Sequence, residues 1–423
     1  MTRKMKDSGI EWMGEIPEDW EVSKIKYHFK VISGSGFPIS LQGKSSGDYP
    51  VCKASDIANA NEILHSAANY LDKYEISGFN IIPKYGVIMP KIGEAMKKNN
   101  RAIVFKDVVI DNNCMGVVPK DVFYKYSFYL MKIINMNWYD NASTIPCVNN
   151  QKFINEFIPN INFELQVTIS NFLDKKTDQI EELKNTINKE IENLENYKKS
   201  LITEAVTKGL DKNMPMKDSG IEWIGQIPKH WEIVKGKYIL RLLKKSVKKD
   251  DEVITCFRDG EVTLRSNRRE DGFTFSEKEI GYQGIDVGDL VVHGMDAFAG
   301  AIGISDSRGK GSPILNVLDS SEDKRFLMYY LRTMAYSHVF EALATGIRVR
   351  SVDLRRNKLY NLPYPVPPLN EQELISDYIY NQIFKVDNLI SKKQKQLETL
   401  EEYKKSLIYE YVTGKKEAHL GKF

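Results

Sequence analysis

The chain has 423 residues, of which 42% are hydrophobic and 28% charged, and its formal net charge at pH 7 is +3. This length suits two to four globular domains, and the small net charge confines any nucleic-acid-binding surface to local basic clusters. No apolar run reaches the roughly 18–20 residues of a membrane span, no secretory signal is present, and four scattered cysteines predict reduced thiols, so we expect a cytoplasmic protein without a membrane partner.

The sequence opens with a segment that is repeated at its midpoint. Residues 5–20 read MKDSGIEWMGEIPEDW and residues 216–231 read MKDSGIEWIGQIPKHW, so 12 of 16 positions are identical. A second repeat closes each half, with ENYKKSLITEAVTKG from Glu195 and EEYKKSLIYEYVTG from Glu401. The chain is therefore a tandem duplication, and we expect two related modules with internal pseudo-twofold symmetry.

Between these repeats, each half contains about 140 residues of short β-like runs separated by Gly, Asn and Asp turns. The two middle segments share a glycine turn, an apolar strand and a polar tip, as in YGVIMPKIG from Tyr85 and VGDLVVHGM from Val287. A helix-like stretch follows in both. This pattern predicts a mixed α/β (α+β) fold, with globular modules over residues 1–158 and 213–364.

A proline-containing joint leads from each module into a long helical pattern. Apolar residues then recur every seven positions, which is typical of a coiled coil. We expect long helices over residues 159–212 and 365–423, the second with a C-terminal tail. The first apolar seam holds Leu173, Ile180, Ile187, Leu194 and Leu201, flanked by Leu183, Ile191 and Tyr197, and the second holds Val386, Leu400 and Leu407, with Lys393 interrupting it.

Neither seam is stable alone in water, so the simplest partner for one helix is the other. The duplication makes this pairing antiparallel, and the paired helices would then separate the two globular modules as a spacer. The alternative is two separate amphipathic helices, each packed on its own module.

The doubled opening, the doubled YKKSLI helix ending and the second joint resemble the specificity subunit of type I restriction–modification systems. The resemblance covers essentially the whole chain. It implies two target recognition domains held apart by two antiparallel helices, each reading one half of a split, asymmetric DNA site. The joint residues that carry it are Pro367, Pro368, Leu369, Glu371 and Gln372, while the first joint has Asn160 and Asn162 in place of prolines and only Gln166 of the Glu-Gln pair.

The resemblance also implies the partners of the chain. These are double-stranded DNA, two methyltransferase subunits and restriction/translocase subunits. The chain itself would be non-catalytic and would bind no cofactor. The S-adenosylmethionine for adenine methylation, ATP and Mg²⁺ would be held by the partner subunits.

The sequence carries no catalytic motif that would assign a reaction to the chain itself. It lacks a GxxxxGK[ST] phosphate loop, and no HExxH or CxxC pair offers a metal site. The segment from Asn361 to Tyr364 resembles a methyltransferase box with leucine at its second position, and we interpret it as a rigid connector. The alternatives to a recognition subunit are a fused DNA methyltransferase or nuclease with drifted motifs, and a coiled-coil scaffold that binds only protein.

Basic and amide residues gather in loops of both modules, and twelve of the 14 arginines lie between Arg241 and Arg356. Arginine pairs with guanine and asparagine with adenine in two-pronged hydrogen bonds, whereas phosphate contacts only position a protein. A solvated basic surface and turn-forming asparagines are the alternatives. The predicted DNA-binding residues are Ser33, Ser35, Lys91, Lys97, Lys98, Asn99, Asn100, Arg101, Asn149 and Asn150 in the first half, and Arg258, Arg265, Asn267, Arg268, Arg269, Arg308, Lys310, Arg348, Arg350 and Ser351 in the second.

Overall fold

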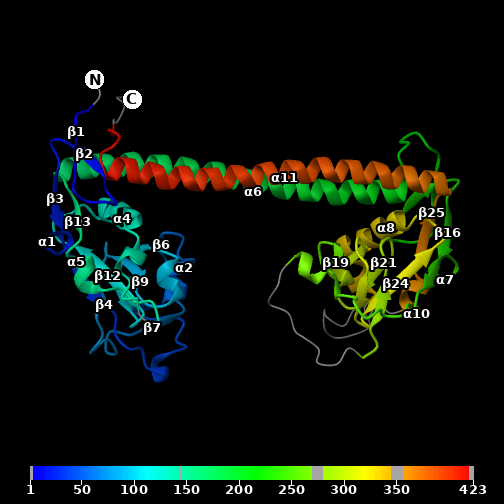
Figure 1. Ribbon diagram of the computed structural model, residues 1–423, viewed down its shortest axis with the longest axis horizontal. Coiled ribbons are helices and arrows are strands. Elements are labelled where there is room, and N and C mark those ends of the chain that lie inside the picture. Colours follow the sequence, from blue (N-terminus) through cyan, green and yellow to red (C-terminus); the bar gives the residue numbers. More distant parts are fainter. Residues whose placement is uncertain (1–2, 143, 269–279, 344–355, 419–423) are drawn as a thin grey trace. The chain divides into compact units, whose positions relative to one another are not determined.

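The computed structural model of the protein describes residues 3–142, 144–268, 280–343 and 356–418. The chain forms two compact units (Figure 1). Unit 1 comprises Met1–Thr186 and Lys395–Phe423, and unit 2 comprises Ile187–Gln394. Each unit combines one globular module with a stretch of both long helices, α6 (Phe163–Lys208) and α11 (Leu369–Val412).

The module of unit 1 contains a five-stranded sheet with the order β4-β12-β9-β10-β6 and a four-stranded sheet with the order β7-β5-β11-β8. All four residues of β9 are buried, as expected for the short apolar run of a central strand. The strands are β1 (Met5–Asp7), β2 (Glu15–Pro17), β3 (Glu21–Lys24), β4 (Phe29–Ser33), β5 (Tyr49–Cys52), β6 (Ile63–Leu64), β7 (Asn69–Leu71), β8 (Ile81–Ile82), β9 (Val87–Pro90), β10 (Ala102–Val104), β11 (Val108–Ile110), β12 (Cys114–Pro119) and β13 (Phe157–Asn160), and the module's helices are α1 (Ile25–His28), α2 (Ala54–Asn59), α3 (Glu94–Lys97), α4 (Tyr124–Ile133) and α5 (Asn150–Ile154).

The module of unit 2 repeats the central part of this plan in a four-stranded sheet with the order β17-β24-β21-β22. The ladders β18–β19 and β20–β23 of this module contain two strands each. The strands are β14 (Met216–Asp218), β15 (Gln226–Pro228), β16 (Glu232–Lys235), β17 (Leu240–Leu242), β18 (Ile254–Cys256), β19 (Val262–Leu264), β20 (Gln283–Ile285), β21 (Leu290–His293), β22 (Ile302–Ile304), β23 (Gly309–Gly311), β24 (Leu315–Ser320) and β25 (Pro363–Val366), and the helices are α7 (Gly236–Ile239), α8 (Lys324–Tyr336), α9 (Val339–Ala342) and α10 (Arg356–Asn361).

The duplicated opening segments form the same structure in both units. Lys6 pairs with Ile16 in the β1–β2 hairpin, and Lys217 pairs with Ile227 in β14–β15, so the register is the same in both copies. The strand that enters each module then pairs with the strand that leaves it, β3 with β13 and β16 with β25. Prolines are tolerated in β13 and β25 because these two-stranded ladders leave each strand a free edge. The internal repeat predicted from the sequence is thus present in the strand pairing.

The seven-residue seam of α6 is buried at the predicted positions nearest the modules, Leu173, Ile180 and Leu201. A second row of residues completes the apolar seam of α6. Each of its members lies four residues after a seam leucine or isoleucine, because residues four apart lie on the same face of a helix. Leu183 and Tyr197 lie three residues after such positions and are 53% and 54% exposed, which corrects their predicted place beside the seam. The completing row is Thr177, Lys184, Ile191 and Lys198.

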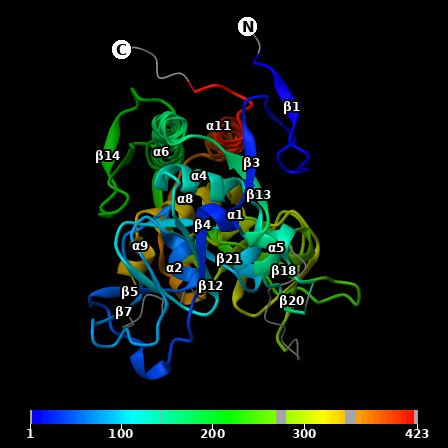
Figure 2. The same ribbon diagram turned by 90° about the vertical axis from the view of Figure 1, so that its left-hand side faces the viewer.

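In unit 1 the two long helices run antiparallel and lie side by side (Figures 1 and 2). The Lys184 Nζ atom lies 2.8 Å from the Glu401 carboxylate, and the Lys404 Nζ atom lies 3.0 Å from the Glu181 carboxylate. Residue numbers therefore decrease along α6 while they increase along α11, so the two helices are antiparallel.

Unit 2 uses the same kind of contact. The Lys198 Nζ atom lies 2.8 Å from Asp387, and the Lys393 Nζ atom lies 2.5 Å from Glu190. The Lys198–Asp387 pair is the repeat equivalent of the pair between Lys404 and the first-half helix in unit 1. Two mixed α/β modules on a pair of long antiparallel helices are the predicted fold class, and the structure confirms it.

One glutamine in each joint fastens the globular module to its long helix. The Gln166 Oε1 atom accepts a hydrogen bond from the backbone N–H of Phe123 at 2.8 Å, at the start of α4, and the amide donates to the Ile161 carbonyl at 2.9 Å. Gln372 makes the equivalent bonds to the Asp323 N–H at 3.0 Å and to a joint carbonyl at 2.8 Å. Both glutamines are buried, so these bonds are shielded from water.

We expect Gln166→Ala and Gln372→Ala each to lower the free energy of unfolding by about 2 kcal/mol, because each leaves a buried donor and acceptor without a partner. The effects should add in the double variant, since the two sites share no residues. Urea denaturation of the full chain measures this. The exposed Gln396→Ala on α11 is the matched control and should change the midpoint little. Equal midpoints for all three variants would contradict the assigned role.

Candidate nucleic-acid interface

The loop after β9 in unit 1 is tied to the loop before α5. The Val148 N–H donates to the Lys91 carbonyl at 3.0 Å, and the Gly93 N–H donates to the Pro146 carbonyl at 2.7 Å. Asn149 follows directly and accepts from the Lys152 N–H at 3.0 Å, which caps α5. The backbone thus brings Lys91 and Asn149, two predicted DNA-binding residues from distant parts of the sequence, into one loop cluster.

Ser33, the last residue of β4, and Ser35, in the loop that follows, join this cluster. The Asn150 amide donates to the Ser33 Oγ atom at 3.4 Å. Asn80 holds the serine loop from the other side, because its amide donates to the Ser33 carbonyl at 2.9 Å and its N–H to the Ser35 Oγ at 3.1 Å. We call this group, Ser33, Ser35, Lys91, Asn149 and Asn150, the serine–asparagine cluster. It is small, polar and rich in side chains that can donate and accept hydrogen bonds.

The remaining predicted residues of the first module lie in a second group, at Lys97–Arg101. Lys97 pairs with Glu94 at 2.7 Å. Asn99 has a left-handed backbone with a φ of 54°, and its Oδ1 atom accepts from the Met136 N–H at 2.7 Å. The structure therefore does not bring the Lys97–Arg101 group into the serine–asparagine cluster through any of these bonds.

Arg101 is a correction to the predicted set. Only 6% of the residue is exposed, and its guanidinium donates to the carbonyls of Met131 at 3.1 Å and Ile134 at 3.0 Å. Burial lowers the pKa of Arg101 to about 10, and the side chain stays charged at neutral pH. A guanidinium held in this way cannot reach a base edge, so Arg101 reads no base as folded.

In unit 2, the predicted residues Arg258, Arg265, Asn267 and Arg268 lie on one ladder, the β18–β19 hairpin and the turn after it. The Arg258 side chain is 61% exposed and pairs with Asp296 at 2.9 Å. The Arg268 guanidinium lies 4.2 Å from the centre of the Phe257 ring. Lys310 lies on β23, where its N–H donates to the backbone of the segment that leads into this hairpin. This group is rich in arginine where the first module is rich in asparagine.

Arg308 is a second correction. Its guanidinium donates to Asp251 at 2.8 Å and to Asp286 at 2.5 Å, and Lys245 also pairs with Asp286 at 2.7 Å. Hydrogen bonds from Lys245 and Arg308 lower the pKa of Asp286 to about 2. These bonds occupy the donors of Arg308 within the module, so the side chain holds the fold instead of contacting DNA. Four further predicted residues, Arg269, Arg348, Arg350 and Ser351, lie outside the described residues.

Sequence reasoning missed an ionic network where the first module meets α11. Lys404 is only 6% exposed in its side chain and lies 2.8 Å from Glu62, which also pairs with Lys132. Burial raises the pKa of Glu62, but the two lysines outweigh it and hold the pKa below its ordinary value. Burial likewise opposes the charge of Lys404, yet its carboxylate partners raise the pKa above normal. The only sequence signal was the repeated YKKSLI, in which Lys404 stands at a position otherwise expected to be solvated.

Within the ranges that the structure describes, no group of three or more His, Cys, Asp or Glu side chains could hold a metal ion. No helix among those residues is long and apolar enough to cross a membrane.

The chain is similar to known proteins over most of its length. Residues 17–193 match the model of the type I restriction modification DNA specificity domain. The chain is 25% identical to the type I restriction enzyme MjaVIII specificity subunit of Methanocaldococcus jannaschii, over 95% of this chain and 93% of that one. It is 24% identical to the putative type I restriction enzyme MjaX specificity subunit of the same organism, over 95% of both. The resemblance expected from the sequence is therefore confirmed.

Solved structures show the same fold. A chain from the structural study of complex assembly and conformational transition of the type I R-M system superposes with a TM-score of 0.68 at 13% identity, covering 95% of this chain and 99% of that one. The HsdS subunit from Thermoanaerobacter tengcongensis gives a TM-score of 0.51 at 14% identity, covering 95% of this chain and 98% of that one. At these identities the likeness establishes the arrangement of elements alone.

We expect Gly34→Ala to destabilise unit 1 and to weaken DNA binding, because a Cβ at residue 34 would lie 1.8 Å from the Asp111 carbonyl oxygen. Overpacking against backbone costs about 1–3 kcal/mol or more and would displace the serine loop. Gly36→Ala, two residues on, is the matched control because a Cβ there meets nothing within 4 Å. Thermal unfolding and DNA binding of the two variants test this, and equal behaviour would show that the serine loop tolerates a side chain at position 34.

Proposed function

We propose that this chain is the DNA sequence-recognition subunit of a type I restriction–modification complex. One observation carries the proposal: a single chain holds two modules with the same strand register and the same joint bonds, while their loops carry different side chains. A protein that needed only a scaffold would not require two unlike loop sets. Two modules with the same fold and different loops suit a DNA site that is bipartite and asymmetric.

The two loop sets differ in the chemistry they offer to bases. The serine–asparagine cluster of unit 1 presents amides, which pair with adenine in a two-pronged manner, while the hairpin of unit 2 presents arginines suited to guanine. Arg258, with its exposed guanidinium, is the best placed of these. We infer that the half-site read by unit 2 contains a G·C pair and that the half-site read by unit 1 is richer in A·T pairs.

The chain would recognise the DNA site, and its partner subunits would catalyse the reaction. We infer that the chain is non-catalytic and that methyltransferase subunits carry S-adenosylmethionine and flip out the target adenine, which is unreachable inside the base stack. Restriction/translocase subunits would use ATP and Mg²⁺. We infer that the chain acts in the cytoplasm together with these partner subunits.

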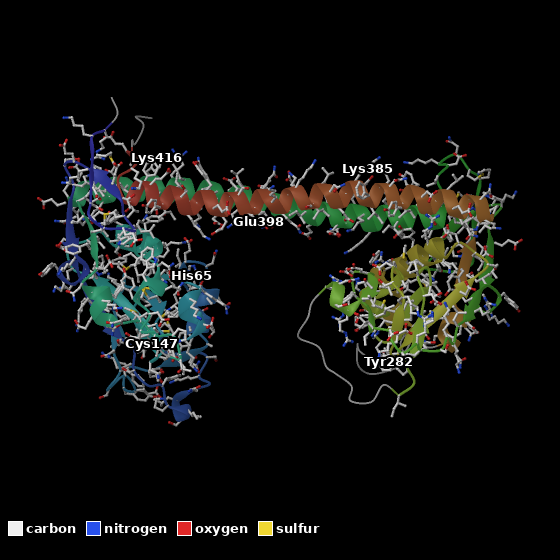
Figure 3. The ribbon with its side chains drawn as sticks, viewed as in Figure 1. His65, Cys147, Tyr282, Lys385, Glu398 and Lys416 are labelled. Atoms are coloured by element: carbon white, nitrogen blue, oxygen red, sulfur yellow. The ribbon has the colours of Figure 1, made fainter. Side chains whose placement is uncertain are left out.

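The long helices offer one surface per unit for a methyltransferase subunit. Leu183 and Tyr403 are 53% and 50% exposed in unit 1, and their repeat equivalents Leu389 and Tyr197 are 47% and 54% exposed in unit 2. In each unit, an ion pair joins the helix turn that carries the leucine to the turn of the other helix that carries the tyrosine. These pairs are Lys184–Glu401 in unit 1 and Lys198–Asp387 in unit 2. Lys385, about one turn before Leu389, points away from the sheets of unit 2 in Figure 3, so the module does not cover this flank. Two equivalent surfaces suit two copies of one partner.

Methylation mapping tests the function. When the chain is expressed with its methyltransferase partner, long-read sequencing of the host DNA should show adenine methylation at one split motif with unequal halves. The isolated chain, incubated with labelled S-adenosylmethionine and DNA, should transfer no methyl group. Transfer by the chain alone would favour a fused methyltransferase, and binding without any sequence preference would favour a protein-binding scaffold.

We expect Leu183→Asp and Leu389→Asp each to remove one methyltransferase subunit from the complex, and the double variant to remove both. A charge in the centre of such a surface costs about 2 kcal/mol or more, which is roughly a 30-fold loss of affinity. Native mass spectrometry of the purified complex counts the subunits. The exposed Gln396→Asp serves as the control, and retention of two partner subunits by the double variant would place their binding sites elsewhere.

A further inference from the structure

A cavity of about 630 Å³ opens in unit 1 between the first module and α11. The module contributes the loop Lys98–Arg101 and the segment after α2, and α11 contributes Lys404 and Lys405. Five of the lining side chains are cationic and two, Glu62 and Glu401, are anionic. The cavity therefore has an excess of positive charge.

Ion pairs already neutralise both carboxylates of the cavity. Glu62 pairs with Lys132 and with Lys404, and Glu401 pairs with Lys184 of α6 at 2.8 Å. The network also includes Glu181, which Lys404 reaches at 3.0 Å, so three carboxylates and three ammonium groups balance one another. The surplus charge of the cavity must come from residues outside this network.

Three residues supply that surplus. Lys98 and Lys405 are exposed and line the cavity from opposite sides, one on the module and one on the helix. Arg101 is buried beneath them, and its guanidinium donates to backbone carbonyls and to the Asn99 amide oxygen, with no carboxylate partner among the described residues. A buried charge without a counter-ion is costly, and an anion placed in the cavity would compensate it.

The backbone around the cavity is also strained. Six non-glycine residues of the described chain have a positive φ, and three of them, Asn61 at 43°, Glu62 at 76° and Asn99 at 54°, line this cavity. Such conformations cost about 1–3 kcal/mol each and cluster at ligand-binding sites. Here they turn the two loops so that they form opposite parts of the cavity lining.

The described residues of the second half do not repeat this arrangement, although both long helices carry the same YKKSLI segment. Lys199 is the equivalent of Lys405, but its ammonium lies 5.9 Å from the centre of the Tyr336 ring. The strand equivalent to the one after Arg101 is β22, which begins at Ile302 and is preceded by Gly300 and Ala301, so the buried arginine has no counterpart there. The cavity is thus a property of unit 1 and not of the duplicated frame.

We propose that this cavity binds a phosphate group, held by Lys98 and Lys405 above the buried charge of Arg101. The cavity is lined by the Lys98–Arg101 loop of a module proposed to bind DNA, so we assign the phosphate to the DNA backbone, and this assignment rests on the proposed function. Phosphate is the anion that fits, because lysines bind it as point charges and its several oxygens can accept hydrogen bonds from more than one cation. In this role the loop positions the duplex and does not read its sequence.

Salt titration of DNA binding tests the proposal with the full chain. Lys405→Gln and Lys98→Gln should each weaken binding about threefold to tenfold, equally for a duplex with the methylated motif and for an unrelated duplex. Each should also reduce the slope of log K against log salt concentration by about 0.9, the value for one phosphate contact. Lys199→Gln removes a lysine that is also exposed, at the equivalent position, and should change neither quantity.

A second measurement separates the two sources of phosphate. Thermal unfolding is followed while inorganic phosphate replaces chloride at constant ionic strength. If phosphate stabilises the wild type more than Lys405→Gln and the DNA slopes of the two are equal, the cavity binds free phosphate, and only the assignment to DNA fails. If neither the slope nor the response to phosphate differs between wild type, Lys405→Gln and Lys98→Gln, the proposal is overturned.

The two measurements distinguish a failure of the cavity proposal from a failure of the proposed function. A wild type that binds all duplexes equally would refute sequence recognition, while the difference in slope between Lys405→Gln and Lys199→Gln would still report the cavity. A wild type that prefers one motif, with Lys405→Gln and Lys98→Gln indistinguishable from it in both measurements, would leave sequence recognition intact and refute the cavity alone.

Discussion

The seam between α6 and α11 is the interaction on which the rest of the structure depends. A helix of 46 residues with one apolar stripe is not stable alone in water, and here Leu173, Ile180 and Leu201 of the stripe are buried. Lysines interrupt the seam at Lys184, Lys198, Lys393 and Lys404, and each meets a carboxylate of the opposite helix. A lysine in a seam without its carboxylate would be costly, so these pairs disfavour any other register.

The ends of the long helices explain why unit 1 contains both ends of the chain. Gly209 follows α6 with a φ of 73° and lies against Trp231, where a Cβ would come within 3.3 Å. Gly414 follows α11 with a φ of 75° and lies in the same way against Trp20, within 2.8 Å. Each helix therefore ends on a tryptophan of an opening segment, and only glycine permits both the left-handed turn and the close approach. The C-terminal helix completes the first module as the first helix completes the second.

The sequence predicted the features that depend on periodicity and repetition, and it failed where charge pairing decides. The duplication, the joints and the long helices followed from spacing alone. The flanking stripe was partly misplaced because three-residue and four-residue neighbours look alike in a sequence, so Leu183 and Tyr197 were placed beside the seam although both are exposed. Arg101 and Arg308 were assigned to DNA because a loop arginine looks the same whether it faces solvent, backbone carbonyls or two aspartates. Only the fold brings Asp251 and Asp286 to Arg308 across residues that are far apart in the chain.

The two halves share some hydrogen bonds at their joints and differ in others. The shared bonds are those of a side chain that joins more segments. Trp231 donates to Glu371 at 3.1 Å, whereas leucine stands at the equivalent position of the first joint and the Trp20 indole nitrogen, buried, has no partner among the described residues. The first half kept the glutamine beside it, Gln166, which joins the joint, the start of α4 and the long helix in one side chain. The indole bond joins only two segments, and Arg3 over the Trp20 ring at 5.3 Å leaves that contact packed. Because the bonds that orient a module are few and buried, its loops are free to change their side chains without moving the frame that aims them.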